Sequence, residues 1–182
     1  MPELRVAEHC LEVAATTNLL DSLLAAGIRV PYSCRAGSCH ACLVRCVRGD
    51  VLDGQPEALD QAKREQGWRL ACQCRVVDDV HVEVFDPLRD GVAALIEACD
   101  WLSPTVLRVR LTPQRPLRYS AGQHLQLWTE DGIARPYSLA SLPGEDPWLE
   151  FHIDCRQGGA FASAARAFQP GDSLRLGELR GA

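Results

Sequence analysis

The chain has 182 residues, nine of which are cysteines, and a formal net charge of −5. Hydrophobic residues make up 47% and charged residues 24%, a composition typical of a soluble globular protein rather than of a disordered or membrane chain. The excess acid lies mostly in the first half, so nucleic acid is not expected as a partner. Because no apolar run approaches the roughly 18 residues of a membrane span and no secretory signal pattern opens the chain, we expect no membrane partner and a cytoplasmic protein.

The length suits two domains of about 90 residues each. Alternating apolar residues predict two short strands at 4–7 and 10–13. A helix should follow, capped by Asn18 with Asp21 three residues on and closed by Gly27 in a left-handed conformation. The next segment is too rich in small residues for regular structure and indicates a binding loop. Beyond this loop we expect strands at 43–47, 68–71 and 79–84 and a short surface helix within 57–65.

Cysteines dominate this predicted loop. Cys34, Cys39 and Cys42 follow the pattern C-x4-C-x2-C, and Cys72 follows after 29 intervening residues. This is the ligand spacing of a plant-type 2Fe-2S cluster. Three thiolates from one short loop can converge on a cluster if the backbone comes close, and the loop has the small residues that allow it: Ala36, Gly37, Ser38 and Ala41. The predicted metal ligands are therefore Cys34, Cys39, Cys42 and Cys72.

Two alternatives compete with this ligand set. Cys74 lies near the same strand end as Cys72, although the Leu-Ala-Cys-Gln context and the 29-residue gap favour Cys72. Structural zinc could use four of the cysteines, but it usually employs paired Cys-x2–4-Cys knuckles, which only Cys39 and Cys42 match cleanly. The remaining cysteines are expected to be small buried hydrophobic residues: Cys10, Cys46, Cys99 and Cys155.

The segment 34–42, taken with Leu-Ala-Cys-Gln at 70–73, resembles the ferredoxin domain of the reductases that serve bacterial ring-hydroxylating dioxygenases and multicomponent monooxygenases. The resemblance covers roughly residues 3 to 85. It implies an α+β β-grasp domain over residues 1–86 and an acceptor protein such as an oxygenase. His40 departs from the family, which usually has glycine there, and should alter hydrogen bonding or exposure at the cluster more than the existence of the cluster.

The second half has a different pattern. Residues 85–91 combine proline, glycine and charge, which predicts a linker. Strands then recur about every ten residues, as in an antiparallel barrel. They are expected at 92–98, 105–111, 123–129, 135–141, 148–153 and 173–177, with one alanine-rich helix at 160–168.

Two motifs in this half resemble the flavin-binding barrel of ferredoxin-NADP reductases. One is Arg135-Pro136-Tyr137-Ser138, for which the resemblance implies an arginine on flavin phosphate, a tyrosine on the isoalloxazine and a serine near N5. The other is Gly158-Gly159 before the predicted helix, whose free N–H groups suit the FAD pyrophosphate. Ser163 lies one position later than the serine of the family. The predicted cofactor is FAD.

Together these motifs predict a β-grasp ferredoxin domain at 1–86 and an all-β antiparallel Greek-key barrel at 91–182. The chain resembles the first two-thirds of an NAD(P)H-dependent oxygenase reductase, an oxidoreductase that passes electrons from FAD through the cluster to an acceptor protein. Because no G-x-G-x-x-G occurs, the C-terminal NAD domain is expected to be absent, and NAD(P)H to act only through a missing or separate domain. The rival interpretations are a ferredoxin-like electron carrier without bound flavin and a metal-stabilised interaction module.

Overall fold

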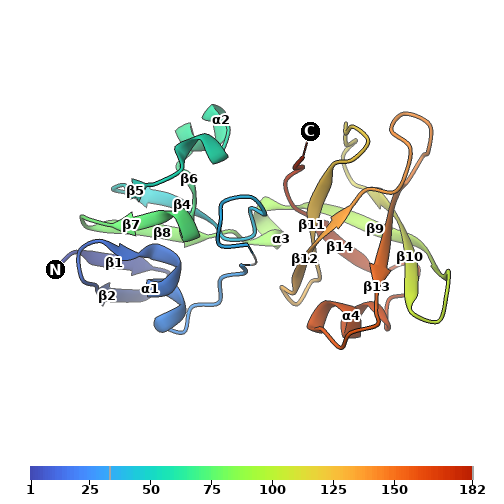
Figure 1. The fold of residues 1–182 in the computed structure, drawn as a ribbon, viewed down its shortest axis with the longest axis horizontal. Coiled ribbons are helices and arrows are strands. Elements are labelled where there is room, and N and C mark those ends of the chain that lie inside the picture. Colours follow the sequence, from blue (N-terminus) through green and yellow to red (C-terminus); the bar gives the residue numbers. More distant parts are fainter. Residues whose placement is uncertain (33, 182) are drawn as a thin grey trace. The chain divides into compact units, whose positions relative to one another are not determined.

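A computed structural model describes residues 1–32 and 34–181. The chain divides into two compact units, Met1–Phe85 and Asp86 onward (Figure 1). Each unit has its own hydrophobic core. None of the helices among the described residues is both long enough and apolar enough to cross a membrane.

A five-stranded sheet forms the base of the first unit, with strand order β2-β1-β8-β4-β6. β1 and β8 run parallel, and the other neighbours are antiparallel. The strands are β1 (Glu3–Val6), β2 (His9–Glu12), β4 (Leu43–Arg48), β6 (Trp68–Leu70) and β8 (Val80–Val84). A smaller sheet in the order β3-β7-β5 consists of β3 (Thr17–Asn18), β7 (Cys74–Val76) and β5 (Leu52–Asp53).

Asn18 caps helix α1 (Leu19–Ala25), and its side chain accepts a hydrogen bond from the Asp21 backbone, as the sequence predicts. Gly27 follows it with φ +79°, a conformation that favours glycine. The leucines of α1 at 19, 20 and 23 are fully buried in the first core, where each contributes about 1.5–3 kcal/mol. The remaining helical turns of the unit are η1 (Pro56–Ala58), α2 (Gln61–Glu65) and η2 (Ala71–Gln73).

Six antiparallel strands make up the second unit, in the order β12-β11-β14-β9-β10-β13. They are β9 (Val92–Trp101), β10 (Val106–Pro113), β11 (His124–Trp128), β12 (Ala134–Ser138), β13 (Leu149–Asp154) and β14 (Ser173–Leu176). Just beyond β12, the Ala140 N–H donates to the Glu150 carbonyl at 2.8 Å, which joins the two outer strands and closes the barrel. Helix α4 (Ala160–Ala165) precedes the last strand. The β-grasp unit followed by an antiparallel barrel confirms the predicted fold class.

The predicted linker at 85–91 contains a short helical turn. Pro87–Asp90 form this turn, α3, in the second unit, because the Asp86 carboxylate accepts a hydrogen bond from the Leu88 backbone at 3.0 Å and Pro87 is suited to a first helical position.

The expectation that the remaining cysteines are buried is wrong in part. Cys155 is buried and Cys46 and Cys99 are half-buried, but Cys10 is exposed on β2.

Candidate functional site

The cysteine loop lies between α1 and β4 and follows an unusual backbone path. Arg35, Gly37 and His40 all have left-handed conformations, with φ of 53°, 80° and 57°. Only glycine adopts this region freely, so two non-glycine residues there indicate that the surrounding contacts determine the path. Arg35 is held by an ion pair with Asp21 at 2.9 Å, and its guanidinium lies 4.9 Å from the centre of the Tyr32 ring.

The four cysteines predicted as ligands lie close enough to affect one another's pKa. Cys34 contributes to the raised pKa of Cys39. Cys72 and, to a smaller extent, Cys39 raise the pKa of Cys42. Among the described residues, no three histidine, cysteine, aspartate or glutamate side chains meet closely enough to hold a single metal ion. Four neighbouring sulfur donors suit a cluster with two iron atoms, because each iron of a plant-type centre needs two thiolates.

Backbone N–H groups of the loop point at the Cys34 sulfur. The amides of Ala36, Ser38 and Cys39 lie 3.2, 3.4 and 3.4 Å from Cys34 Sγ. Burial alone would raise the pKa of Cys34, but these amides and the Ser38 hydroxyl outweigh burial and lower the pKa to about 6. The loop therefore favours a thiolate, the form in which cysteine binds metal.

Cys72 also has its charged form stabilised. The hydrogen bond from Cys42 is the largest cause; burial opposes it, but the Gln73 side chain and the Gly37 N–H also stabilise the thiolate, and the pKa falls to about 6. The Asn18 side chain holds the neighbouring backbone, because its Nδ2 lies 2.9 Å from the Cys72 carbonyl oxygen. The spacing of the cysteines does not indicate that Asn18 and Gln73 form hydrogen bonds with Cys72.

Cys74, the competing fourth ligand, has a different environment. Its side chain is fully buried in the first hydrophobic core. Burial raises its pKa well above the ordinary value, so this thiol stays protonated. The structure therefore favours Cys72 over Cys74.

The Arg135–Ser138 motif forms most of the outer strand β12. Side chains two residues apart on a strand share a face, so Arg135 and Tyr137 lie on the same face, while Pro136 and Ser138 are exposed on the other. The Arg135 guanidinium is exposed and donates to the Ala134 carbonyl at 2.8 Å. The Tyr137 ring is half-buried, and burial is the main cause that raises its pKa to about 12.

The structure brings the tyrosine of this motif to the glycine-led helix. The rings of Tyr137 and Phe161, the second residue of α4, have centroids 5.2 Å apart. Gly159 caps α4, and a Cβ built on Gly158 or Gly159 meets nothing within 4 Å among the described residues. Since Gly159 has an ordinary φ of −84°, the fold itself does not require glycine there, and the open space leaves room for a ligand to approach the backbone. Ser163 is exposed, and its N–H is already bonded to the Gly159 carbonyl at 3.0 Å.

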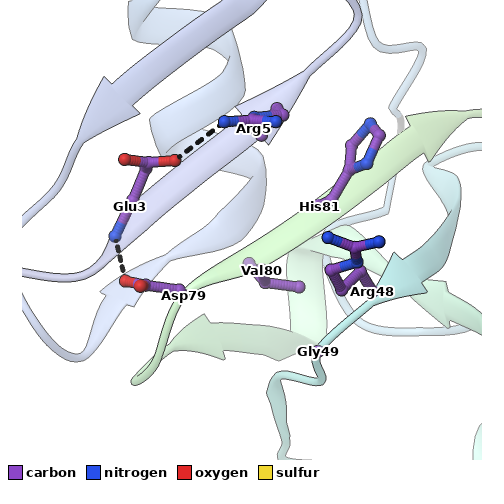
Figure 2. A pocket seen from close by; sticks show the side chains of 7 residues that line it. All are labelled: Glu3, Arg5, Arg48, Gly49, Asp79, Val80 and His81. Atoms are coloured by element: carbon purple, nitrogen blue, oxygen red, sulfur yellow. Dashed lines mark hydrogen bonds and ion pairs between the residues drawn. The ribbon is translucent and has the colours of Figure 1, made fainter.

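A separate hollow of about 280 Å³ lies on the outer face of the first sheet (Figure 2). Arg5 pairs with His81 across β1 and β8, and His81 pairs with Arg48 across β8 and β4. The Glu3 carboxylate forms an ion pair with Arg5 at 3.4 Å, and the Asp79 carboxylate accepts the Glu3 N–H at 2.7 Å. None of the residues that line the hollow belongs to the predicted sites.

Comparisons with known families agree with the division of the chain into two units. Residues 4–77 match the family described as "2Fe-2S iron-sulfur cluster binding domain", and residues 102–181 match the "Oxidoreductase FAD-binding domain". The chain has a ferredoxin domain followed by a flavin domain of the oxidoreductase type. Its cofactors are a 2Fe-2S cluster and FAD. The four neighbouring thiols of the ferredoxin domain and the open glycine turn of the flavin domain fit these two groups.

Relatives of both domains in series are known. The terephthalate 1,2-dioxygenase reductase component 1 of Comamonas sp. is 30% identical over 167 residues, which are 87% of this chain and 50% of that protein. The aromatic O-demethylase reductase subunit of Amycolatopsis sp. is 36% identical over 151 residues, 78% and 45% of the two chains. Among solved structures, a ferredoxin reductase in carbazole 1,9a-dioxygenase matches with a TM-score of 0.52 and 28% identity, over 99% of this chain and 60% of that one. The chain spans about half the length of the curated relatives it matches.

Proposed function

We propose that the chain is the FAD- and 2Fe-2S-containing part of an oxygenase reductase, which passes electrons from FAD through the cluster to an acceptor protein such as an oxygenase. The hydrogen-bond donors aimed at the ligand sulfurs, three loop amides at Cys34 and the Gln73 side chain at Cys72, carry the proposal. The names of the relatives support it, because they are reductase components or subunits of a dioxygenase and a demethylase. The cytoplasmic location and the entry of NAD(P)H through a further or separate domain belong to the same proposal.

When bound, FAD exchanges electrons in pairs and the cluster one at a time. The residues of this chain provide the environments. The N–H groups of the cysteine loop point their partial positive charge toward the Cys34 sulfur, and this stabilises negative charge on that ligand. Arg135 offers an exposed guanidinium suited to phosphate, and Tyr137 a ring whose position is held by Phe161. We assign cluster binding to Cys34, Cys39, Cys42 and Cys72, and flavin binding to Arg135, Pro136, Tyr137, Ser138, Gly158, Gly159 and Ser163.

An absorption spectrum of the purified protein tests this assignment. A yellow-brown protein that releases FAD on denaturation and contains two iron atoms per chain supports the proposal. A red-brown protein without FAD would instead be a ferredoxin-like carrier, and a colourless zinc protein an interaction module. Transfer is tested by photoreducing the flavin anaerobically and following the cluster by electron paramagnetic resonance. If the flavin is reduced while the cluster stays oxidised, electron transfer in this order is wrong.

A further inference from the structure

The side chain of Gln73 lies between two parts of the predicted cluster site. Its Nε2 is 3.0 Å from the backbone oxygen of Arg35 in the cysteine loop. The same atom is 3.4 Å from the sulfur of Cys72, the ligand that comes from outside the loop. A side-chain amide has two N–H donors, so one group can serve both acceptors at once.

The backbone of Gln73 is held in place by its neighbours. The Gly54 N–H donates to the Gln73 carbonyl at 2.9 Å, and Asn18 donates to the carbonyl of Cys72. A Cβ built on Gly37 would lie 3.3 Å from Gln73 Cγ, so the loop also packs against the stem of this side chain. The amide is therefore positioned before any cofactor binds, and little conformational entropy is lost when it donates to the sulfur.

A donor at a ligand sulfur affects the two redox states of a cluster unequally. Reduction adds negative charge, which spreads onto the sulfur ligands, so an N–H donor stabilises the reduced form more than the oxidised form. Hydrogen bonds to the sulfurs are among the factors that set the potential of iron–sulfur centres. A donor at Cys72 should therefore raise the reduction potential.

We propose that Gln73 is a positioning residue of the iron–sulfur site: one N–H raises the reduction potential of the cluster through Cys72, and the other ties that ligand to the cysteine loop at Arg35. The inference rests on the proposed function, because it requires a cluster bound to Cys72. It adds a residue that the cysteine spacing does not reveal.

The test compares the reduction potentials of Gln73→Met and Gln55→Met. Methionine keeps the length of glutamine but lacks its donors, and Gln55 is a matched control because its side-chain oxygen also lies against Gly37. For Gln73→Met we expect a roughly threefold to tenfold lower ratio of reduced to oxidised cluster at a fixed potential, which is a downward shift of about 28 to 59 mV for a one-electron couple. Gln55→Met should titrate like the unaltered protein. Equal potentials in all three proteins would overturn the inference.

A second measurement uses the unaltered protein, in case Gln73→Met loads no cluster. With ¹⁵N only in glutamine side-chain amides, pulsed electron paramagnetic resonance of the reduced cluster should detect a nitrogen coupling that Gln55→Met retains. Absence of the coupling would overturn the inference whatever the variants do. If the unaltered protein itself contains no 2Fe-2S cluster, the proposed function fails. An intact cluster without the coupling, or with an unchanged potential in Gln73→Met, removes only the role of Gln73.

Discussion

At the scale of single residues, Cys72 and Cys74 are two residues apart but lie in opposite environments. Cys72 is half-buried and receives hydrogen bonds that favour the thiolate, whereas Cys74 is fully buried among apolar side chains. We expect Cys72→Ser to abolish the cluster or to destabilise it severely, because a 2Fe-2S core needs four good donors. Cys74→Ala should keep two iron atoms per chain and lower the stability on the order of 1 kcal/mol. Iron analysis decides, and loss of iron only in Cys74→Ala would reverse the assignment.

Gly37 offers a second residue-scale prediction. It has φ +80°, and an added Cβ would lie 2.3 Å from Gln55 Oε1. Gly27 has nearly the same φ of +79° but open space around it, so Gly27→Ala is a matched control for the backbone cost alone. Both substitutions should cost about 1 kcal/mol through the left-handed backbone. Only Gly37→Ala should also speed the loss of the cluster on dilution into chelator.

Removing the Gln55 side chain as well, in Gly37→Ala with Gln55→Ala, should relieve the clash but leave the backbone cost. Cluster loss should then slow toward the rate of the unaltered protein. Identical loss rates in Gly37→Ala and Gly27→Ala would mean that the space beside Gly37 has no effect on the cluster.

At the scale of elements, strand β12 and helix α4 give separate tests of flavin binding. Arg135 is exposed, and the one side-chain hydrogen bond of its guanidinium among the described residues goes to the carbonyl of Ala134. Arg135→Ala should therefore weaken FAD retention at little cost to the fold. Tyr137→Ala should also weaken it, but with a loss of packing on Phe161 of about 0.5–1.5 kcal/mol beyond the buried area. Tyr137→Phe keeps the ring and should retain more FAD than Tyr137→Ala.

FAD released on denaturation and iron content, measured on the same samples, check this prediction. Iron should be unchanged in all three variants, because the cysteines belong to the other unit and its separate core. Joint loss of FAD and iron in Arg135→Ala would contradict the independence of the two sites.

The elements that sequence patterns predicted well are those with a local cause. Helix α1 has its cap and its leucine stripe within ten residues, and the ligand spacing of the cysteine loop is itself local. The strands β3, β5 and β7 were missed, because two or three residues are too few to show an alternation. The predicted strand 135–141 ends at Ser138, since the following backbone changes partner: Leu139 donates to Gln123 and Ala140 to Glu150.

The helix expected at 160–168 is also shorter than predicted. It ends at Ala165, and the next N–H groups form tighter i to i−3 bonds, from Ala167 to Ala164 and from Phe168 to Ala165. Two long-range contacts could not be predicted from the sequence: Asn18 with the Cys72 carbonyl and Gln73 with the Arg35 carbonyl. They depend on how the start of α1 and the cysteine loop meet the turn η2, and pairwise contacts between distant segments leave no periodic signal.

At the scale of the whole molecule, the two cofactors belong to two units with separate cores. The cysteines predicted as ligands all lie before Phe85, and the predicted flavin motifs all lie after Asp86. The 182 residues contain no glycine-rich dinucleotide motif. A binding site for the nicotinamide donor therefore has less support in this sequence than the cluster site or the flavin site.

Hydride transfer requires the nicotinamide ring to lie about 3 to 3.5 Å from the flavin, held there by binding energy from the rest of the dinucleotide. We expect a protein of these 182 residues to be reduced readily by dithionite, giving the paramagnetic resonance of a plant-type cluster, but only very slowly by NADH or NADPH. Supplying a nicotinamide-binding domain, in the same chain or separately, should restore fast reduction. Stopped-flow absorbance provides the measurement: rapid bleaching by NADH that saturates with dinucleotide concentration would mean that these residues alone position the donor.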